Sequence, residues 1–304
     1  MNQGQMISEI KRLRTEKNAV ILSHNYQIDP IQDLADFVGD SLELARKATQ
    51  ANAKMIVMCG VDFMAETAKL LNPEKKVLIP SMTSHCPMSG MLKPKDIIEA
   101  KKRHPDAAVV LYVNSSAECK ALADVCCTSA NADKVVNALP QEEVIFGPDR
   151  NLGLFVQKRS SKKIIHLPEK GFCYTHKKFS WNEIEAILKE HPGAEVVAHP
   201  ECDFEIQEKA HAVKSTSGML RYCKESDAKE FIIATEVGLL HRLEKENPEK
   251  KFYPACSDAV CLQMKDITLE KLYKALLKEQ FEVQLPPETS RKAVAAIQRM
   301  LEIR

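Results

Sequence analysis

The chain has 304 residues, with 43 basic and 42 acidic side chains and a formal net charge of +1. This balance argues against nucleic acid or a membrane surface as the main partner. No apolar stretch approaches the length of a membrane span, and the N-terminus lacks the basic and apolar regions of a signal peptide. Ten cysteines in such a chain are typical of a reducing compartment, so we expect a cytoplasmic protein whose thiols are metal ligands or core residues.

The first part of the chain has the pattern of a small α/β layer. A predicted helix from Ile7 to Arg14 comes before four short apolar runs, and the second and third runs lead into helical stretches. The four runs are 19–26, 35–41, 55–60 and 75–80. Runs rich in Val and Ile, without polar alternation and separated by amphipathic segments of helix length, predict parallel strands buried on both faces.

The same order of elements returns twice, which is the signature of an internal repeat. Predicted helices from Ile97 to Arg103 and from Ile184 to Glu190 open the second and third copies. The runs of the second copy are 109–115, 123–129, 144–147 and 162–168. Those of the third copy are 195–201, 210–216, 231–235 and 250–254. We therefore expect three compact α/β sub-domains that share one centre, each with a four-stranded parallel sheet.

The repeats set the expected domain boundaries at 1–90, 91–178 and 179–285. Within the last range, a helix from Leu269 to Lys278 and a strand-like segment from Phe281 to Leu285 follow the third copy. A terminal helix within 286–304 is expected to pack back on the first repeat.

Three cysteines occupy the same position in the three repeats. Cys86 and Cys173 are 87 residues apart, and Cys173 and Cys261 are 88 apart. Each follows the fourth predicted strand in a loop, where core packing gives no reason for a thiol. Closure around a pseudo-threefold axis would bring the three thiols together, and three thiolates with one open position describe a catalytic metal centre. Cys256 competes with Cys261 for this role, but the repeat spacing favours Cys261.

Chemically active side chains lie at the carboxyl ends of the predicted strands, where functional groups of parallel α/β layers gather. His24, Tyr112 and His199 share one repeat position and are candidates for proton transfer. Hydroxyls recur after the second strand of each copy, at Ser41, Ser129 and Thr216. Helix capping alone would explain these hydroxyls, but a helix start can also bind a phosphate or a carboxylate.

Together these segments resemble the quinolinate synthases over nearly the whole chain. The segments that carry the resemblance are His24–Gln27, Gly39–Leu42, Gly60–Glu66, Cys86–Met88, Tyr112–Ser115, Thr128–Asn131, Phe146–Leu152 and His199–Cys202. The resemblance implies a triangular fold of three α/β/α sub-domains around a central active site. It also implies one 4Fe-4S cluster on the axis, held by one cysteine from each sub-domain, with one iron left without a protein ligand.

The resemblance further implies a reaction in NAD biosynthesis. Iminoaspartate, supplied by an aspartate oxidase or dehydrogenase, would condense with dihydroxyacetone phosphate to form quinolinate, with loss of phosphate and water. A three-cysteine cluster leaves one iron able to act as a Lewis acid toward a substrate oxygen or nitrogen, which suits the elimination of water. No Gly-rich dinucleotide fingerprint or Walker-type loop is present, so nucleotide cofactors are not implied.

With this resemblance, individual residues receive expected roles. We expect Ser41 and Ser129 near the phosphate, and Ser215 and Thr216 near a carboxylate. Asn114 would hold a carbonyl oxygen, and His176 matches the cysteine and histidine pattern of its loop. The expected proton-transfer residues are His24, Tyr26, Tyr112, His199 and Glu201. His24, Tyr112, His176, His199 and Glu201 are also expected to contact substrate.

Two other interpretations remain open at the level of the sequence. A mononuclear zinc enzyme could use three thiolates and a water. A non-catalytic iron-sulfur sensor or scaffold could use the same three cysteines, but it would have no use for the histidines, tyrosines and hydroxyls at the strand ends. The tandem Cys126 and Cys127 would be easily oxidised only if exposed, and their strand position favours burial.

Overall fold

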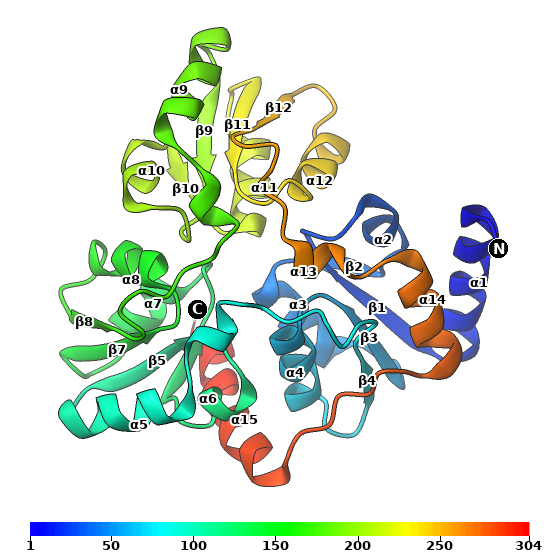
Figure 1. Cartoon of the computed structure of the whole chain (residues 1–304), viewed down its shortest axis with the longest axis horizontal. Helices are drawn as coiled ribbons and strands as arrows, with labels where there is room; N and C mark the ends of the chain where they lie inside the picture. Colours follow the sequence, from blue (N-terminus) through cyan, green and yellow to red (C-terminus); the bar gives the residue numbers. More distant parts are fainter. Residues whose placement is uncertain (304) are drawn as a thin grey trace.

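The computed structural model of the protein describes residues 1–303, and it confirms an α/β architecture of three lobes around a common centre (Figure 1). Each lobe holds one four-stranded sheet in which all strands are parallel. The strand order is β2-β1-β3-β4 in the first repeat, β6-β5-β7-β8 in the second and β10-β9-β11-β12 in the third, so the topology repeats without change.

The twelve strands match the twelve apolar runs. In the first repeat they are β1 Ala19–His24, β2 Phe37–Gly39, β3 Met55–Cys59 and β4 Lys76–Leu78. In the second they are β5 Ala108–Tyr112, β6 Val125–Cys127, β7 Glu143–Gly147 and β8 Lys163–His166. In the third they are β9 Glu195–Ala198, β10 Ala212–Val213, β11 Glu230–Ala234 and β12 Lys251–Pro254.

Helices connect the strands and flank the sheets. In the first repeat they are α1 Gln3–Glu16, α2 Asp29–Leu34, α3 Ser41–Gln50 and α4 Asp62–Leu71. In the second they are α5 Pro94–Arg103, α6 Ala117–Lys120, α7 Ala132–Asn137 and α8 Arg150–Gln157. In the third they are α9 Trp181–Glu190, α10 Phe204–Lys209, α11 Thr216–Glu225 and α12 Leu239–Glu246. The tail holds α13 Leu262–Lys265, α14 Leu269–Lys278 and α15 Pro287–Glu302.

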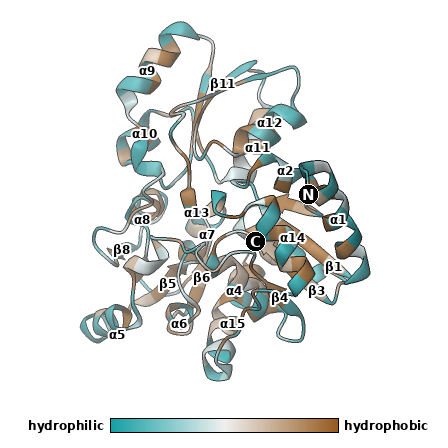
Figure 2. Ribbon diagram, turned by 45° about the vertical axis from the view of Figure 1, so that its right-hand side comes forward, coloured by the Kyte–Doolittle hydropathy of each residue, from teal (hydrophilic) through white to brown (hydrophobic). Residues whose placement is uncertain are grey.

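The central strands are apolar because helices exclude water from both of their faces. Every residue of β3 and of β5 is buried. Figure 2 shows hydrophobic colour along strands such as β1 and β3, whereas outer helices such as α5 and α9 have hydrophilic surfaces. One cluster of buried side chains contains residues of all three sheets, for example Leu22, Val110 and Val197, so the lobes share a core. No helix within residues 1–303 is both long enough and apolar enough to cross a membrane.

A buried polar residue at one repeat position shows how closely the three copies correspond. The side-chain amides of Gln32 and Gln207 each donate hydrogen bonds to three backbone carbonyls around the loops that follow β1 and β9. Lys120 stands at this position in the second repeat, and its Nζ donates to the carbonyl of Ser115. These bonds satisfy buried carbonyls, which would otherwise destabilise the strand-end loops that carry the site.

The tail does not follow the expected boundaries. Helix α14 and the segment Phe281–Leu285, which the repeat boundaries place in the third repeat, lie against the first. Helix α14 packs on α1, Phe281 and Ile79 exchange backbone hydrogen bonds, and the Val283 amide donates to the carbonyl of Val77 in β4. Helix α15, which we expected on the first repeat, contacts α4 there but packs mainly on β6 and α6 of the second repeat. Repeat spacing says nothing about the tail, because these residues have no counterpart in the other copies.

Candidate active site

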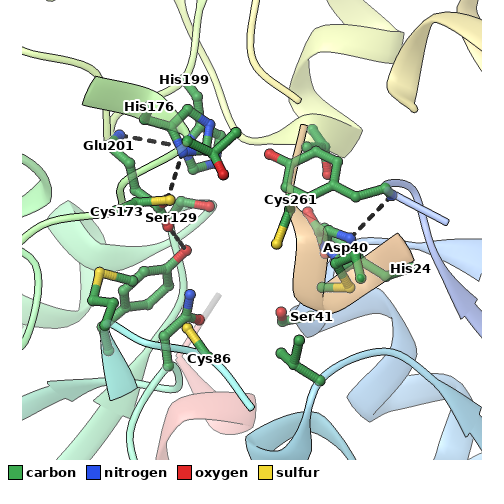
Figure 3. Close-up of a pocket in the computed structure, with 18 of the residues that line it drawn as sticks. His24, Asp40, Ser41, Cys86, Ser129, Cys173, His176, His199, Glu201 and Cys261 are labelled. Atoms are coloured by element: carbon green, nitrogen blue, oxygen red, sulfur yellow. Dashed lines mark hydrogen bonds and ion pairs between the residues drawn. The ribbon is translucent and has the colours of Figure 1, made fainter. Parts of the chain in front are cut away.

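One cavity lies where the three repeats meet, and it is lined by side chains from each of them. Cys86, Cys173 and Cys261 all line this cavity. Figure 3 shows these cysteines on different sides of one open space, among the strand-end residues. The other expected site residues in its lining are His24, Tyr26, Ser41, Tyr112, Asn114, Ser129, His176, His199, Glu201 and Thr216. Ser215 is the one expected residue outside the lining.

The three cysteines are free thiols in a setting that disfavours negative charge. Burial raises the pKa of Cys86, Cys173 and Cys261. Negative charge on Cys261 would raise the pKa of the other two further. Cys256 packs in the core of the third lobe and does not line the cavity. The geometry therefore brings together the three cysteines that the repeat spacing selected.

A carboxylate at one repeat position supports each cysteine loop, and sequence analysis missed all three. The amide of Cys86 donates to Asp62 Oδ1 at 3.1 Å, and the amide of Cys261 donates to Glu236 Oε1 at 3.0 Å. Asp149 occupies the same position in the second repeat; burial raises the pKa of its carboxyl, and the Cys173 amide opposes this rise. The three acids are 87 residues apart, directly after the third strand of each copy. Their spacing was the signal that could have found them.

The two strand-end histidines adopt the same local conformation. His24 Nδ1 accepts a hydrogen bond from the Tyr26 amide, and His199 Nδ1 accepts one from the Glu201 amide, both at 3.2 Å. Burial lowers the pKa of each imidazole to about 3. Both rings are therefore neutral near pH 7, and because Nδ1 is an acceptor the proton lies on Nε2. Each ring lines the cavity, where Nε2–H is available as a donor.

Short polar contacts connect Tyr112 of the second repeat with Tyr26 of the first through side chains of the second and third repeats. Tyr112 Oη donates to Glu201 Oε1 at 2.6 Å, and Glu201 Oε2 lies 2.8 Å from His176 Nδ1. His176 Nε2 lies 2.9 Å from Thr235 Oγ1, which lies 2.6 Å from Tyr26 Oη. Thr235 was missed, although it ends the third apolar run of its repeat. Such a chain of buried donors and acceptors can hold and relay protons.

Glu201 is the one member of this chain that is held as an anion. Burial alone would raise the pKa of its carboxyl, but the neighbouring His176 lowers that pKa well below its usual value, with smaller contributions from His199 and Tyr112. Burial raises the pKa of Tyr112 and of Tyr26, so both phenols stay protonated. The site thus places a buried carboxylate among neutral proton donors.

Helix capping does not explain the hydroxyls of Ser41 and Thr216, because other residues cap these helices. Asp40 caps α3 through hydrogen bonds from the amides of Leu42 and Glu43, and Ser215 caps α11 by accepting from the Gly218 amide. Ser41 and Thr216 are instead the first residues of these ten-residue helices and line the cavity. They lie at the positive ends of two helix dipoles, which favour anions.

Ser129 also does not cap a helix. It lies in the loop before α7, whose cap residue is Asn131, and it hydrogen-bonds to Tyr112. Two oxygen atoms of the lining, Asn114 Oδ1 and Thr175 Oγ1, are buried and have no hydrogen-bond partner within residues 1–303. Buried polar atoms of this kind are rare unless a ligand satisfies them. The lining is therefore suited to a polar ligand.

Comparison with known proteins agrees with this geometry. The family described as quinolinate synthetase A protein matches residues 8–302. The chain belongs to this family. A quinolinate synthase of Pyrococcus horikoshii is 54% identical over 298 residues, covering 98% of this chain and 99% of that protein. Those of Methanocaldococcus jannaschii and Thermotoga maritima are 52% and 50% identical, each covering 98% of this chain and 99% of its own length.

The donor set of this quinolinate synthetase A family member fits an iron-sulfur cluster. Three convergent thiols from three loops can each ligate one iron, and a metal's positive charge would overcome the burial that keeps them protonated. A mixed set is also present, because Cys173 Sγ, His176 and Glu201 offer ligand atoms within 4.8 Å of one another. The 2.8 Å contact between His176 Nδ1 and Glu201 Oε2 already involves two members of that set.

The neutral state of His24 predicts a measurable pH dependence. Its pKa is about 3 in the folded protein and about 6.5 in an unfolded chain, so only the unfolded chain binds the proton between these values. The stability that this histidine contributes is complete above pH 6.5 and is lost as the pH falls toward 3. Between pH 6 and 4, we expect the unfolding free energy of His24→Gln to fall less steeply than that of the native protein, by about 1.4 kcal/mol per pH unit. Urea unfolding under anaerobic conditions measures both slopes, and parallel curves would contradict the assignment.

Proposed function

We propose that the protein is a quinolinate synthase of NAD biosynthesis, which condenses iminoaspartate with dihydroxyacetone phosphate and releases phosphate and water. Family membership over residues 8–302 supports this function. The observation that carries it is the convergence of Cys86, Cys173 and Cys261 with strand-end histidines, tyrosines and a buried carboxylate in one cavity. An aspartate oxidase or dehydrogenase would supply iminoaspartate, and the reaction would take place in the cytoplasm.

Cys86, Cys173 and Cys261 would hold one 4Fe-4S cluster. When bound, the cluster would supply a Lewis acid at the one iron without a cysteine ligand. The carboxylates of Asp62 and Glu236 would keep the Cys86 and Cys261 loops in place through their amides. This arrangement supports a preorganised three-thiol site rather than one assembled by the metal.

The hydroxyls of the cavity lining would bind the anionic groups of the substrates. Ser41, at the start of α3, and Ser129 would hold the phosphate of the triose, and Thr216 would hold a carboxylate at the start of α11. The Ser215 hydroxyl caps α11 and lies 3.2 Å from Asp40 Oδ2, so its role in carboxylate binding would be to position Thr216. Asn114 would donate from Nδ2 to a substrate carbonyl oxygen, and its Oδ1, which has no partner within residues 1–303, would accept from a substrate N–H or O–H.

Proton transfer would depend on the chain from Tyr112 to Tyr26. Glu201 is the anionic member and is suited to take a proton from a substrate carbon or nitrogen, while Tyr112 at 2.6 Å keeps it oriented. Tyr26 and the neutral His24 and His199 are suited to give protons to departing hydroxyls. Burial excludes bulk water from all of these groups, which strengthens their electrostatic effect on the reacting atoms.

An anaerobic turnover assay with the two substrates, combined with metal analysis of the same preparation, tests this function. We expect quinolinate to form, with about four iron and about four sulfide per chain. One zinc without sulfide would support the mononuclear zinc alternative, in which the three thiolates and a water hold the metal. Cluster-containing protein that makes no quinolinate would support the sensor alternative and contradict the proposal.

A further inference from the structure

A hollow is separated from the cavity by a wall, which is formed by the first turns of α3 and α11 and the loop before α7. Residues of the cavity lining and of the hollow lining alternate along this wall. Ser41 and Thr216 line the cavity, whereas the next residues, Leu42 and Ser217, line the hollow. Asp40 lines both spaces. The hollow is therefore the neighbour of the cavity on the side where we place the anionic groups of the substrates.

Three exposed cations line this hollow, one from each repeat. They are Arg46 on α3, Lys134 on α7 and Arg221 on α11. Arg46 and Lys134 are 88 residues apart, and Lys134 and Arg221 are 87 apart, which is the spacing of the ligand cysteines. Each cation follows the hydroxyl of its own repeat, Ser41, Ser129 or Thr216, by five residues. Single exposed cations on helices are common, but here repeat-related cations surround one opening.

The hollow has more positive than negative side chains. Its acidic residues are Asp40 and Glu43, against the three cations. Glu43 Oε1 lies 4.0 Å from Arg221 Nη1, whereas no carboxylate within residues 1–303 forms an ion pair with Arg46 or Lys134. An anion in the hollow would therefore meet cations whose charge is not neutralised by neighbours.

Exchangeable polar contacts close the wall between hollow and cavity. Ser215 Oγ lies 3.2 Å from Asp40 Oδ2, and Ser217 Oγ donates to Glu43 Oε2, so both contacts join the third repeat to the first. On another side of the hollow, Leu301 and Ile303 belong to the end of α15, which runs toward the middle of the molecule (Figure 1). The two hydroxyl-carboxylate contacts are polar and none of their side chains belongs to the apolar core, so water entering from the hollow can take their place and open this part of the wall.

We propose that this hollow is the entrance for the anionic substrates and that Arg46, Lys134 and Arg221 form a cation ring that draws them in. The inference rests on the proposed function, since a triose phosphate and an amino-dicarboxylate derivative are both anions. Cations around a narrow entrance raise the local concentration of anions and the rate at which they enter. The ring acts on entry, whereas Ser41, Ser129 and Thr216 bind the anionic groups inside the cavity.

The test is the association rate of quinolinate with cluster-containing protein, followed by stopped-flow tyrosine fluorescence because Tyr26 and Tyr112 line the cavity. The ring variant carries Arg46→Gln, Lys134→Gln and Arg221→Gln. The matched control carries Lys11→Gln, Lys102→Gln and Lys189→Gln, which remove the same charge from exposed positions, one in each repeat. At low ionic strength, we expect the ring variant to bind quinolinate about 10-fold more slowly than the control and to lose most of the salt dependence.

A second variant, with Arg46→Lys, Lys134→Arg and Arg221→Lys, keeps the charges and should retain the native association rate. Equal rates and equal salt dependence for the ring variant and the control would overturn the entrance while leaving the proposed function intact. A ring variant that is slow only because it is misfolded would also lose its native circular dichroism, and a charge-keeping variant as slow as the ring variant would overturn the electrostatic role. Native protein that neither binds nor makes quinolinate would contradict both proposals.

Discussion

Replacing any one of Cys86, Cys173 and Cys261 with Ser is expected to abolish both the visible absorbance of the cluster and the formation of quinolinate. Each of these cysteines comes from a different repeat, and each lines the same buried cavity. Losing one would leave only two thiols for a cluster that needs at least three protein ligands here. The measurements are iron and sulfide content, the visible spectrum and anaerobic turnover of each variant.

Cysteines outside the cavity provide the matched controls. Cys202→Ser and Cys223→Ser remove buried thiols, and Cys202 Sγ already donates to the Ala234 carbonyl, a contact that a serine hydroxyl can replace. Both variants should keep the cluster and the activity. Cys256→Ser is the decisive comparison, because Cys256 lies only five residues before Cys261 yet packs in the third lobe. Loss of the cluster in Cys256→Ser but not in Cys261→Ser would disprove the three-repeat ligand set.

Glu201→Gln and Tyr112→Phe are expected to keep the iron content but to lower turnover by a factor on the order of 10² or more, the usual scale for proton-transfer groups. Glu201→Gln removes the buried anion, and Tyr112→Phe removes the hydroxyl that donates to it at 2.6 Å. Tyr26→Phe and His199→Ala are expected to behave in the same way. The rates are measured anaerobically at saturating concentrations of both substrates, with iron content determined on the same samples.

Tyr253→Phe is the control for the tyrosine variants. Its hydroxyl also donates to a carboxylate, at 3.2 Å from Glu230 Oε1, but it lies on β12 and does not line the cavity. Its turnover should be close to native. If Tyr26→Phe, Tyr112→Phe, His199→Ala and Glu201→Gln all turn over at near-native rates, these strand-end residues only pack the centre of the molecule.

Much of the fold was predictable from local patterns. Buried parallel strands need continuous apolar runs, so the twelve strands could be recognised in the sequence, and their order repeats with the spacing of 87 to 88 residues. The same spacing selected Cys86, Cys173 and Cys261 over Cys256, and strand-end positions selected His24, Tyr112 and His199. In each case a periodic arrangement along the chain corresponds to a symmetric arrangement in space, so spacing carries the information.

Other features depended on contacts that no spacing reports. The placement of α14 and α15, the capping of α3 by Asp40 and the position of Ser215 outside the cavity lining all follow from which surfaces meet after folding.

The sequence alone was therefore sufficient to predict three α/β layers and the residue types at their strand ends, because buried strands need apolar runs and the repeat has a fixed spacing. Only the tertiary structure decided how those residues act on one another. The pairing of Glu201 with Tyr112 and His176, and its continuation through Thr235 to Tyr26, joins residues of three repeats. The physical reason is that hydrogen bonds and pKa shifts depend on distances of a few ångströms between segments far apart in the sequence.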